Sequence, residues 1–185
     1  MNLVNNKTFE NINTLERAEY NECTFINCNF SEQKLFNITF SECEFENCNL
    51  SNSKIDQSSF KDVTFRNCKL MGLIFDSLNP FLLKLKFEKC QLDYSSFYQL
   101  KIPKTSFKDC NLVEVDFTEA ILSQSIFANC ELTNAIFDRT NLEKANFTTA
   151  NNYNINPSTN KIKKASFSQD GLAGLLHTFN IVISQ

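Results

Sequence analysis

The 185-residue sequence contains no tryptophan, one histidine, three glycines and three prolines. Most globular folds use more glycine and proline at their turns, so the turns of this chain must form in another way. A single histidine excludes a metal site or a proton relay that needs a histidine pair. We therefore expect His177 to be a solvated surface residue.

Other features of known classes are also missing. A net charge of −3 does not indicate a nucleic-acid-binding protein, and the short apolar runs predict no membrane-spanning helix. The N-terminus lacks the pattern of a signal peptide, which favours a cytoplasmic protein. The sequence has no glycine-rich phosphate loop, nucleophile elbow or zincin motif. We expect no enzyme activity, no cofactor, no metal site and no small-molecule substrate.

The dominant feature is a period of five. The chain contains 19 phenylalanines, and a large apolar residue recurs every fifth position from Tyr20 to Phe75 and again from Phe87 to Phe147. A small residue stands two positions before almost every one of them. This period fits neither an α-helix nor a β-strand. It predicts an all-β coil in which each pentapeptide forms one side of a square, with the large and the small residue both pointing inward.

The repeat resembles the pentapeptide repeat family, whose consensus is a small residue, Asn or Asp, Leu or Phe, and two polar residues. Matching segments are Cys28-Asn29-Phe30-Ser31-Glu32, Cys48-Asn49-Leu50-Ser51-Asn52 and Cys110-Asn111-Leu112-Val113-Glu114. The resemblance covers roughly residues 15–150 and implies a right-handed quadrilateral β-helix. We expect an N-terminal cap over residues 1–17, with Leu3, Val4, Phe9 and Leu15 covering the first coil. The repeat should cover residues 18–169, and residues 170–185 should form a C-terminal segment.

Residues twenty positions apart should form columns along the rod, since four pentapeptides complete one turn. The phenylalanine column Phe25, Phe45, Phe65 continues as Phe87, Phe107, Phe127 with an offset of two. This offset predicts a bulge near residues 77–79. We expect Pro80 and Leu82 to form the inward pair there, leaving Phe81 and Leu83 in outward positions. The irregular stretch 151–164 should occupy one coil, because Ala165 and Phe167 return to register.

All eight cysteines stand at the small inward position. The alternatives are that the cysteines bind a metal or form disulfides. The spacing of the cysteines does not bring four metal ligands together. A cytoplasmic chain keeps its thiols reduced, which argues against disulfides. We expect the cysteines to act as small buried packing residues.

The C-terminal segment changes period. Leucines and a phenylalanine at i, i+3, i+4 and i+7 predict a short amphipathic helix after Gly171, and Ile181, Val182 and Ile183 predict a terminal strand. The segment either caps the rod or joins two copies. It resembles the C-terminal segment of the Qnr-type quinolone-resistance subgroup, which implies a homodimer formed end to end. The residues expected to carry this contact are Leu172, Leu175, Leu176, Phe179, Ile181 and Ile183.

The resemblance to the Qnr-type subgroup also implies a function. Such rods resemble duplex DNA in size and shape, bind DNA gyrase and topoisomerase IV, and protect these enzymes from quinolones or toxins. Carboxylates on one side would stand in for phosphates. The alternative is a non-enzymatic structural or interaction scaffold with another protein partner. The residues expected to contact a partner are Asp56, Asp76, Phe81, Leu83, Tyr98, Asp116, Glu119 and Asp138.

Overall fold

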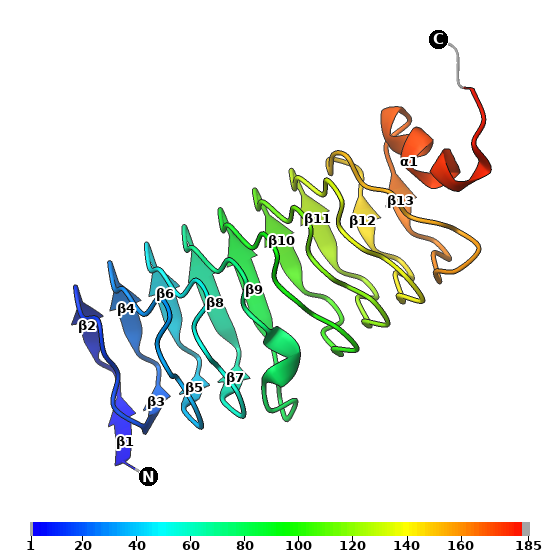
Figure 1. Ribbon diagram of the computed structural model, residues 1–185. Helices are drawn as coiled ribbons and strands as arrows, with labels where there is room; N and C mark the ends of the chain where they lie inside the picture. The colour runs from blue at the N-terminus through cyan, green and yellow to red at the C-terminus, as the bar shows by residue number, and fades with distance from the viewer. Residues whose placement is uncertain (1, 183–185) are drawn as a thin grey trace.

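The computed structural model describes residues 2–182. The chain forms a rod of stacked parallel coils, with the N-terminus at one end of the rod and the C-terminus at the other (Figure 1). A sheet of order β1-β3-β5-β7 lies on one side, and a sheet of order β13-β12-β11-β10-β9-β8-β6-β4-β2 runs along another. The strands are β1 (Asn2–Asn5), β2 (Thr8–Glu10), β3 (Ala18–Asn21), β4 (Thr24–Ile26), β5 (Thr39–Ser41), β6 (Glu44–Glu46), β7 (Ser59–Lys61), β8 (Val63–Arg66), β9 (Leu85–Glu88), β10 (Ser106–Lys108), β11 (Ile126–Ala128), β12 (Asn146–Phe147) and β13 (Ser166–Phe167). The predicted right-handed β-helix is confirmed.

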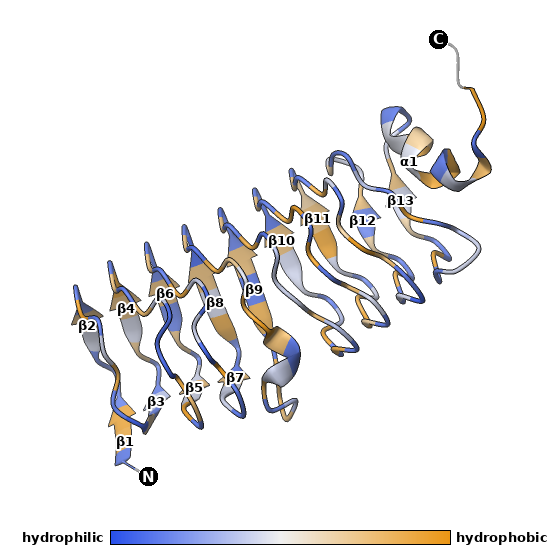
Figure 2. Ribbon diagram, in the orientation of Figure 1, coloured by the Kyte–Doolittle hydropathy of each residue, from blue (hydrophilic) through white to orange (hydrophobic). Residues whose placement is uncertain are grey.

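The core follows directly from the period of five. The large and small inward residues of the repeats are buried, while hydrophilic residues separate them along each coil (Figure 2). One side carries a continuous stack of rings from Phe9 to Phe167, with neighbouring centroids 4.5 to 5.5 Å apart. Rings from another side meet this stack edge to face, as Phe117 meets Phe107 at 5.9 Å. Such offset and perpendicular contacts add to the stability that burial provides.

The corners explain how a chain poor in glycine makes so many turns. Within residues 2–182, the backbone adopts φ values of 50° to 62° at 28 non-glycine residues, 11 of them asparagine. They recur mostly every fifth position, two residues after each large inward residue. Several corners are closed by a backbone hydrogen bond, such as Ser53 N–H to the Leu50 carbonyl at 3.0 Å. A positive φ at the third residue makes these type II turns.

The bulge lies a few residues later in the chain than predicted. The Asn79 N–H still donates to the Ser58 carbonyl at 2.8 Å, so the register continues through Asn79, and Leu78 is buried. The two extra residues lie between Asn79 and Leu85, which pairs with Val63. The expected inward pair is therefore wrong, because Pro80 and Leu82 are both exposed. Proline has no N–H to donate to the ladder.

Within this bulge, the Lys84 N–H resumes the ladder at the Phe60 carbonyl, 3.1 Å away. Phe81 is exposed as expected, whereas Leu83 is half-buried and packs against the core. Leu82 takes the corner conformation, with φ of 58°. A 3₁₀ turn, η1 (Phe75–Ser77), precedes the bulge.

The N-terminal residues do not form a separate cap. β1 and β2 pair in parallel with β3 and β4, and Phe9 stacks on Phe25 with centroids 5.1 Å apart. This first coil is shorter than the others, because Asn2 pairs with Ala18. The rod therefore begins at Asn2 and not at residue 18.

The irregular stretch 151–164 keeps the register, since Asn146 pairs with Ser166 across it. Asn160 occupies the small inward position, where its amide donates to the Phe137 carbonyl at 2.9 Å and accepts from the Thr140 N–H at 2.9 Å. These bonds satisfy a polar side chain inside the core.

The C-terminal segment folds as the turn η2 (Asp170–Leu172), the helix α1 (Ala173–Leu176) and the turn η3 (His177–Phe179). Two glycines let it dock on Tyr153. A Cβ on Gly174 would lie 2.1 Å from the Tyr153 carbonyl oxygen, and one on Gly171 would lie 2.0 Å from its hydroxyl. The short helix is confirmed, but Ile181 and Val182 belong to no strand, and Ile183 lies outside the described residues.

Candidate partner-binding face

One side of the rod gathers most of the predicted contact residues. Parallel bridges join Ile74, Ser96, Asp116 and Ile136 on successive coils. The next column of the same side holds Asp76, Tyr98, Thr118 and Asp138, and the corner beside it holds Gln99, Glu119 and Arg139. We call this side, over residues 54–57, 74–77, 96–99, 116–119 and 136–139, the acidic face.

The structure brings together six of the eight predicted contact residues. Asp76, Tyr98, Asp116, Glu119 and Asp138 lie on neighbouring coils of the acidic face, and Asp56 lies toward its N-terminal end. Phe81 lies elsewhere, on the next side of the square, where the Lys61 ammonium is 5.9 Å from the centre of its ring. Leu83 follows it in the same bulge. The predicted set therefore divides between two sides of the rod.

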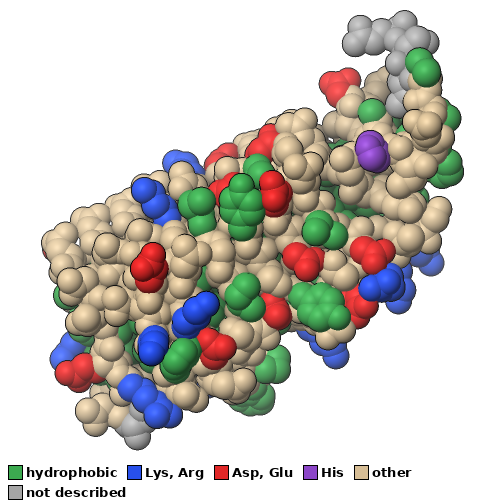
Figure 3. Space-filling view, viewed as in Figure 1, with side chains coloured by type: hydrophobic (Ala, Val, Ile, Leu, Met, Phe, Trp, Pro, Cys, Tyr) green, Lys and Arg blue, Asp and Glu red, His purple; other side chains and the backbone are tan. Residues whose placement is uncertain are grey.

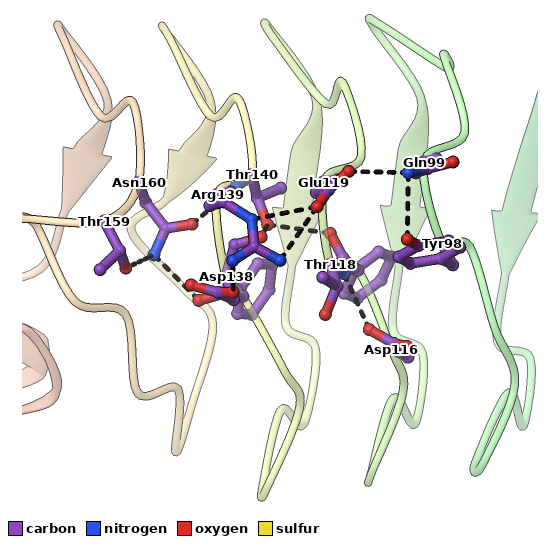
Figure 4. Close-up of polar contacts among 12 residues, drawn as sticks. Tyr98, Gln99, Asp116, Thr118, Glu119, Asp138, Arg139, Thr140, Thr159 and Asn160 are labelled. Atoms are coloured by element: carbon purple, nitrogen blue, oxygen red, sulfur yellow. Dashed lines mark hydrogen bonds and ion pairs between the residues drawn. The ribbon is translucent and has the colours of Figure 1, made fainter.

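The carboxylates of the acidic face are held by short polar contacts (Figure 4). The Ser96 hydroxyl donates to Asp76 at 2.6 Å, and the Thr118 N–H donates to Asp116 at 2.8 Å. The Gln99 amide donates to Glu119 at 2.7 Å and also to the Tyr98 hydroxyl at 3.0 Å. The hydrogen bond from Gln99 and the guanidinium of Arg139 hold the pKa of Glu119 below its usual value. Glu119 therefore stays ionised at neutral and mildly acidic pH.

Arg139 lies among the predicted contact residues, although the sequence did not predict it as one of them. Its guanidinium lies 2.9 Å from Glu119 and 3.1 Å from Asp138, so one cation partly neutralises two of the predicted carboxylates. Residues 119 and 139 are one coil apart, and the column rule would have placed them side by side. Ile74 and Ile136 are also exposed here, at 43% and 50%.

The exposed surface of this face mixes three kinds of side chain. Acidic side chains lie among hydrophobic ones over the middle coils, with basic ones toward both ends (Figure 3). Asp56 and Asp76 are exposed, whereas Asp116, Glu119 and Asp138 are half-buried. The face offers carboxylates and isolated apolar contacts to a partner without a cleft for a small molecule.

The cysteines lie inside the rod. All eight are buried and free, as predicted, and six of them form one column: Cys28, Cys48, Cys68, Cys90, Cys110 and Cys130. Their thiols donate to backbone carbonyls, as Cys48 does to Phe25 at 3.3 Å. Burial raises the pKa of the Cys43 thiol to about 12. Among residues 2–182, no group of three or more histidine, cysteine or carboxylate side chains is placed to hold a metal ion.

The C-terminal segment exposes several of the residues expected at a dimer contact. Leu172, Phe179 and Ile181 are 46%, 56% and 56% exposed. Leu176 is also exposed, whereas Leu175 packs against the core. His177 lies on the surface, as expected. No helix within residues 2–182 is long and apolar enough to span a bilayer.

Comparisons with known proteins agree with this architecture. The sequence matches the family profile described as "Pentapeptide repeat region" over residues 13–97, 38–115 and 82–175. Full-length QnrB1, a plasmid-mediated fluoroquinolone resistance protein, has a similar structure, with a TM-score of 0.67, 14% identity, and coverage of 96% of this chain and 100% of that one. A trypsin-treated form of QnrB1 gives a TM-score of 0.66 at 15% identity, covering 100% and 99%. A search of curated proteins finds no match. At these identities the likeness to QnrB1 shows the fold.

Proposed function

The chain belongs to the pentapeptide repeat family, and on this premise we propose that it is a DNA-mimicking rod that binds a type II topoisomerase. The enzyme is DNA gyrase or topoisomerase IV, which the rod protects from quinolones or toxins in the cytoplasm. The protein acts by binding and not by catalysis.

The observation that carries the proposal is the acidic face. Asp76, Asp116 and Asp138 lie on coils that repeat at about 4.8 Å, the spacing of paired strands. Rigid coils hold these carboxylates in place, so little side-chain freedom is lost when they meet a basic surface. A surface that normally holds DNA phosphates is complementary to such a row. The full-length structural likeness to QnrB1, a fluoroquinolone resistance protein, supports a role in protection from quinolones.

A homodimer formed end to end through the C-terminal segment would lengthen this rod. The exposed side chains of Leu172, Leu176, Phe179 and Ile181 supply the apolar contact, and closed two-fold dimers are the commonest assembly. At about 500 mM NaCl, where contacts between exposed charges are screened, Phe179→Asp should convert such a dimer to a monomer in sedimentation experiments without unfolding the rod. A wild-type monomer at all concentrations would contradict the dimer.

The experiment that tests the function is a DNA-supercoiling assay with purified gyrase and ciprofloxacin over a series of concentrations of this protein. We expect supercoiling to be restored at micromolar protein or below. The matched variant is Asp76→Asn with Asp138→Asn, which removes two charges and should raise the protein concentration needed. Neither rescue nor inhibition would favour the alternative, a scaffold for another partner.

A further inference from the structure

The side of the rod that follows the acidic face carries the most uneven charge distribution. Beyond the shorter first coil, whose strand β1 pairs with β3, its outward residues come from eight stacked coils: 19–22, 39–42, 59–62, 79–84, 101–104, 121–124, 141–144 and 161–164. Ladder pairs connect Glu19 to Thr39 and Thr39 to Ser59, and bridges connect Lys101, Ile121, Asn141 and Lys161. We call it the bipolar side.

The two halves of the bipolar side have opposite charge. The coils of residues 19–22, 39–42 and 59–62 carry the carboxylates Glu19, Glu22, Glu42 and Asp62 and the single lysine Lys61. The last four coils carry one carboxylate, Glu143, and the lysines Lys101, Lys104, Lys144, Lys161, Lys163 and Lys164.

Most of these charges have no partner within the chain. Asp62 pairs with Lys84 at 2.5 Å and Lys86 at 3.0 Å. None of the other carboxylates on this side, and none of the six lysines of its C-terminal half, forms an ion pair within residues 2–182. By contrast, five charges of the neighbouring sheet, Glu44, Arg66, Lys86, Glu88 and Lys108, form ion pairs, as Lys108 does with Glu88 at 2.9 Å.

The middle of the bipolar side is apolar. Phe81 and Leu82 are 66% and 65% exposed at the bulge, and the next coil presents the exposed Pro103. Two large adjacent side chains this exposed indicate a contact surface. The position of the Lys61 ammonium above the Phe81 ring shows that this ring can accept a cation.

We propose that the bipolar side binds a second copy of this chain, with the two rods antiparallel. The two-fold axis lies in the interface, perpendicular to the rod and between the coils of residues 79–84 and 101–104. Such an axis reverses the order of the coils but keeps each column of residues on itself. The coil of residues 19–22 then faces that of residues 161–164 of the second copy, the coil of residues 39–42 faces that of residues 141–144, and so on inward.

This symmetry matches the unpaired charges column by column. Glu19, Glu22 and Glu42 come opposite Lys161, Lys164 and Lys144 of the partner subunit. Asp62, which already has partners within its own chain, comes opposite the neutral Gln124 of the partner subunit. Phe81 and Leu82 meet the coil that carries Lys101, Pro103 and Lys104. Each contact occurs twice, and both rods have the same coil spacing, so the match persists over about 38 Å.

The contact is independent of the proposed binding of a topoisomerase, because it leaves the acidic face free. Its charges are exposed, so the association should weaken as salt screens them. A narrow, mostly polar contact of this kind belongs to the weaker class of interfaces.

Charge reversal tests the proposal. Sedimentation velocity at about 50 mM and about 500 mM NaCl should show wild-type association that is stronger at low salt. Glu42→Lys and Lys144→Glu should each raise the dissociation constant roughly tenfold, since each removes two attractions and creates two repulsions. The combined variant should restore wild-type association. Glu32→Lys is the matched control, because Glu32 occupies the same corner conformation on another side of the rod and should have no effect.

Cross-linking identifies the orientation. The eight native cysteines are buried, so Glu42→Cys and Lys144→Cys each introduce one accessible thiol. A mixture of the two variants should form a disulfide between residues 42 and 144 on mild oxidation by dissolved oxygen, which accepts the two electrons that the thiols lose. Failure to cross-link, a double reversal as weak as the single ones, or a wild-type monomer at low salt would each overturn the proposal. None of these results depends on gyrase.

Discussion

The halves of the rod before and after the bulge use the same repeat differently. Before it, the second ladder of aromatic rings is Tyr20, Phe40 and Phe60, on the side of the sheet β1-β3-β5-β7. From Phe75, just before the bulge, the second ladder lies on the preceding side and continues through Phe97, Phe117 and Phe137, and the four-stranded sheet has ended. The first stack continues through both halves, and its widest step, 5.5 Å, is at the bulge. One continuous stack is therefore enough to keep the coils aligned while the rest of the core changes side.

The corners differ between the halves as well. Asparagine occupies seven of the twelve positive-φ positions from residue 6 to residue 67, but three of the fifteen non-glycine positions from residue 82 to residue 164. Asparagine tolerates this conformation better than other non-glycine residues. The C-terminal half therefore carries more backbone strain, which its core must offset.

The largest expected effect is loss of the common stack. Phe107→Ala should lower the free energy of unfolding by about 3–5 kcal/mol, because it removes buried contacts and leaves a cavity. Ser106→Ala, one residue away and outward, should change it by less than about 0.5 kcal/mol. Chemical denaturation monitors both, and equal effects would contradict the assignment of inward and outward positions.

The second-largest expected effect is a loss of stability in the docked C-terminal segment. Gly174→Ala places a methyl group against the Tyr153 carbonyl and should destabilise the docked segment by about 2 kcal/mol. Hydrogen exchange should then rise in residues 170–179 while the coils before residue 150 keep their protection. Ala173→Ser, at an exposed position beside it, serves as the control. Unchanged exchange in Gly174→Ala would show that the segment does not dock in this way.

Relief of backbone strain at the corners should give a smaller gain in stability. Leu82→Asn and Tyr94→Asn should each stabilise the protein by about 0.5–1 kcal/mol, because both residues now hold positive φ values without asparagine. The reverse change at an exposed corner of the first half, Asn27→Leu, should destabilise by a similar amount. Thermal unfolding measures all three. If Leu82→Asn had no effect, the bulge would not be a site of strain.

The smallest expected effect is electrostatic. The hydrogen bond and charge of Lys84, together with Lys86, lower the pKa of Asp62, which links the coils on either side of the bulge. A lowered carboxyl pKa contributes stability above the unfolded-state value, and this contribution disappears as the pH falls through the folded-state value. Asp62 is largely solvated, so Asp62→Asn should cost less than about 1 kcal/mol at neutral pH and almost nothing in strong acid. A cost that is independent of pH would contradict the ion pair.

The fold could be predicted from the sequence because a period of five admits one way of burying Phe and Cys together. The bulge could not be placed, since Leu78, Pro80 and Leu82 all fit an inward pattern and only the missing N–H of Pro80 distinguishes them. The prediction of a terminal strand was wrong, because the β-branched residues Ile181 and Val182 pair with no strand within the described residues. The columns of the acidic face followed from the period, but the contacts of Arg139 depend on side-chain geometry.

The central claim is that carboxylates of the acidic face take the place of DNA phosphates. The most direct test is competition between this protein and a DNA duplex for purified gyrase at low salt, for the wild type, for Arg139→Gln and for Asp76→Asn with Asp138→Asn. The account predicts that the wild type displaces DNA, that Arg139→Gln displaces it at lower concentration because two carboxylates lose their cation, and that the double variant displaces it less well. Binding of gyrase that leaves DNA in place, or displacement that none of these charges alters, would contradict it.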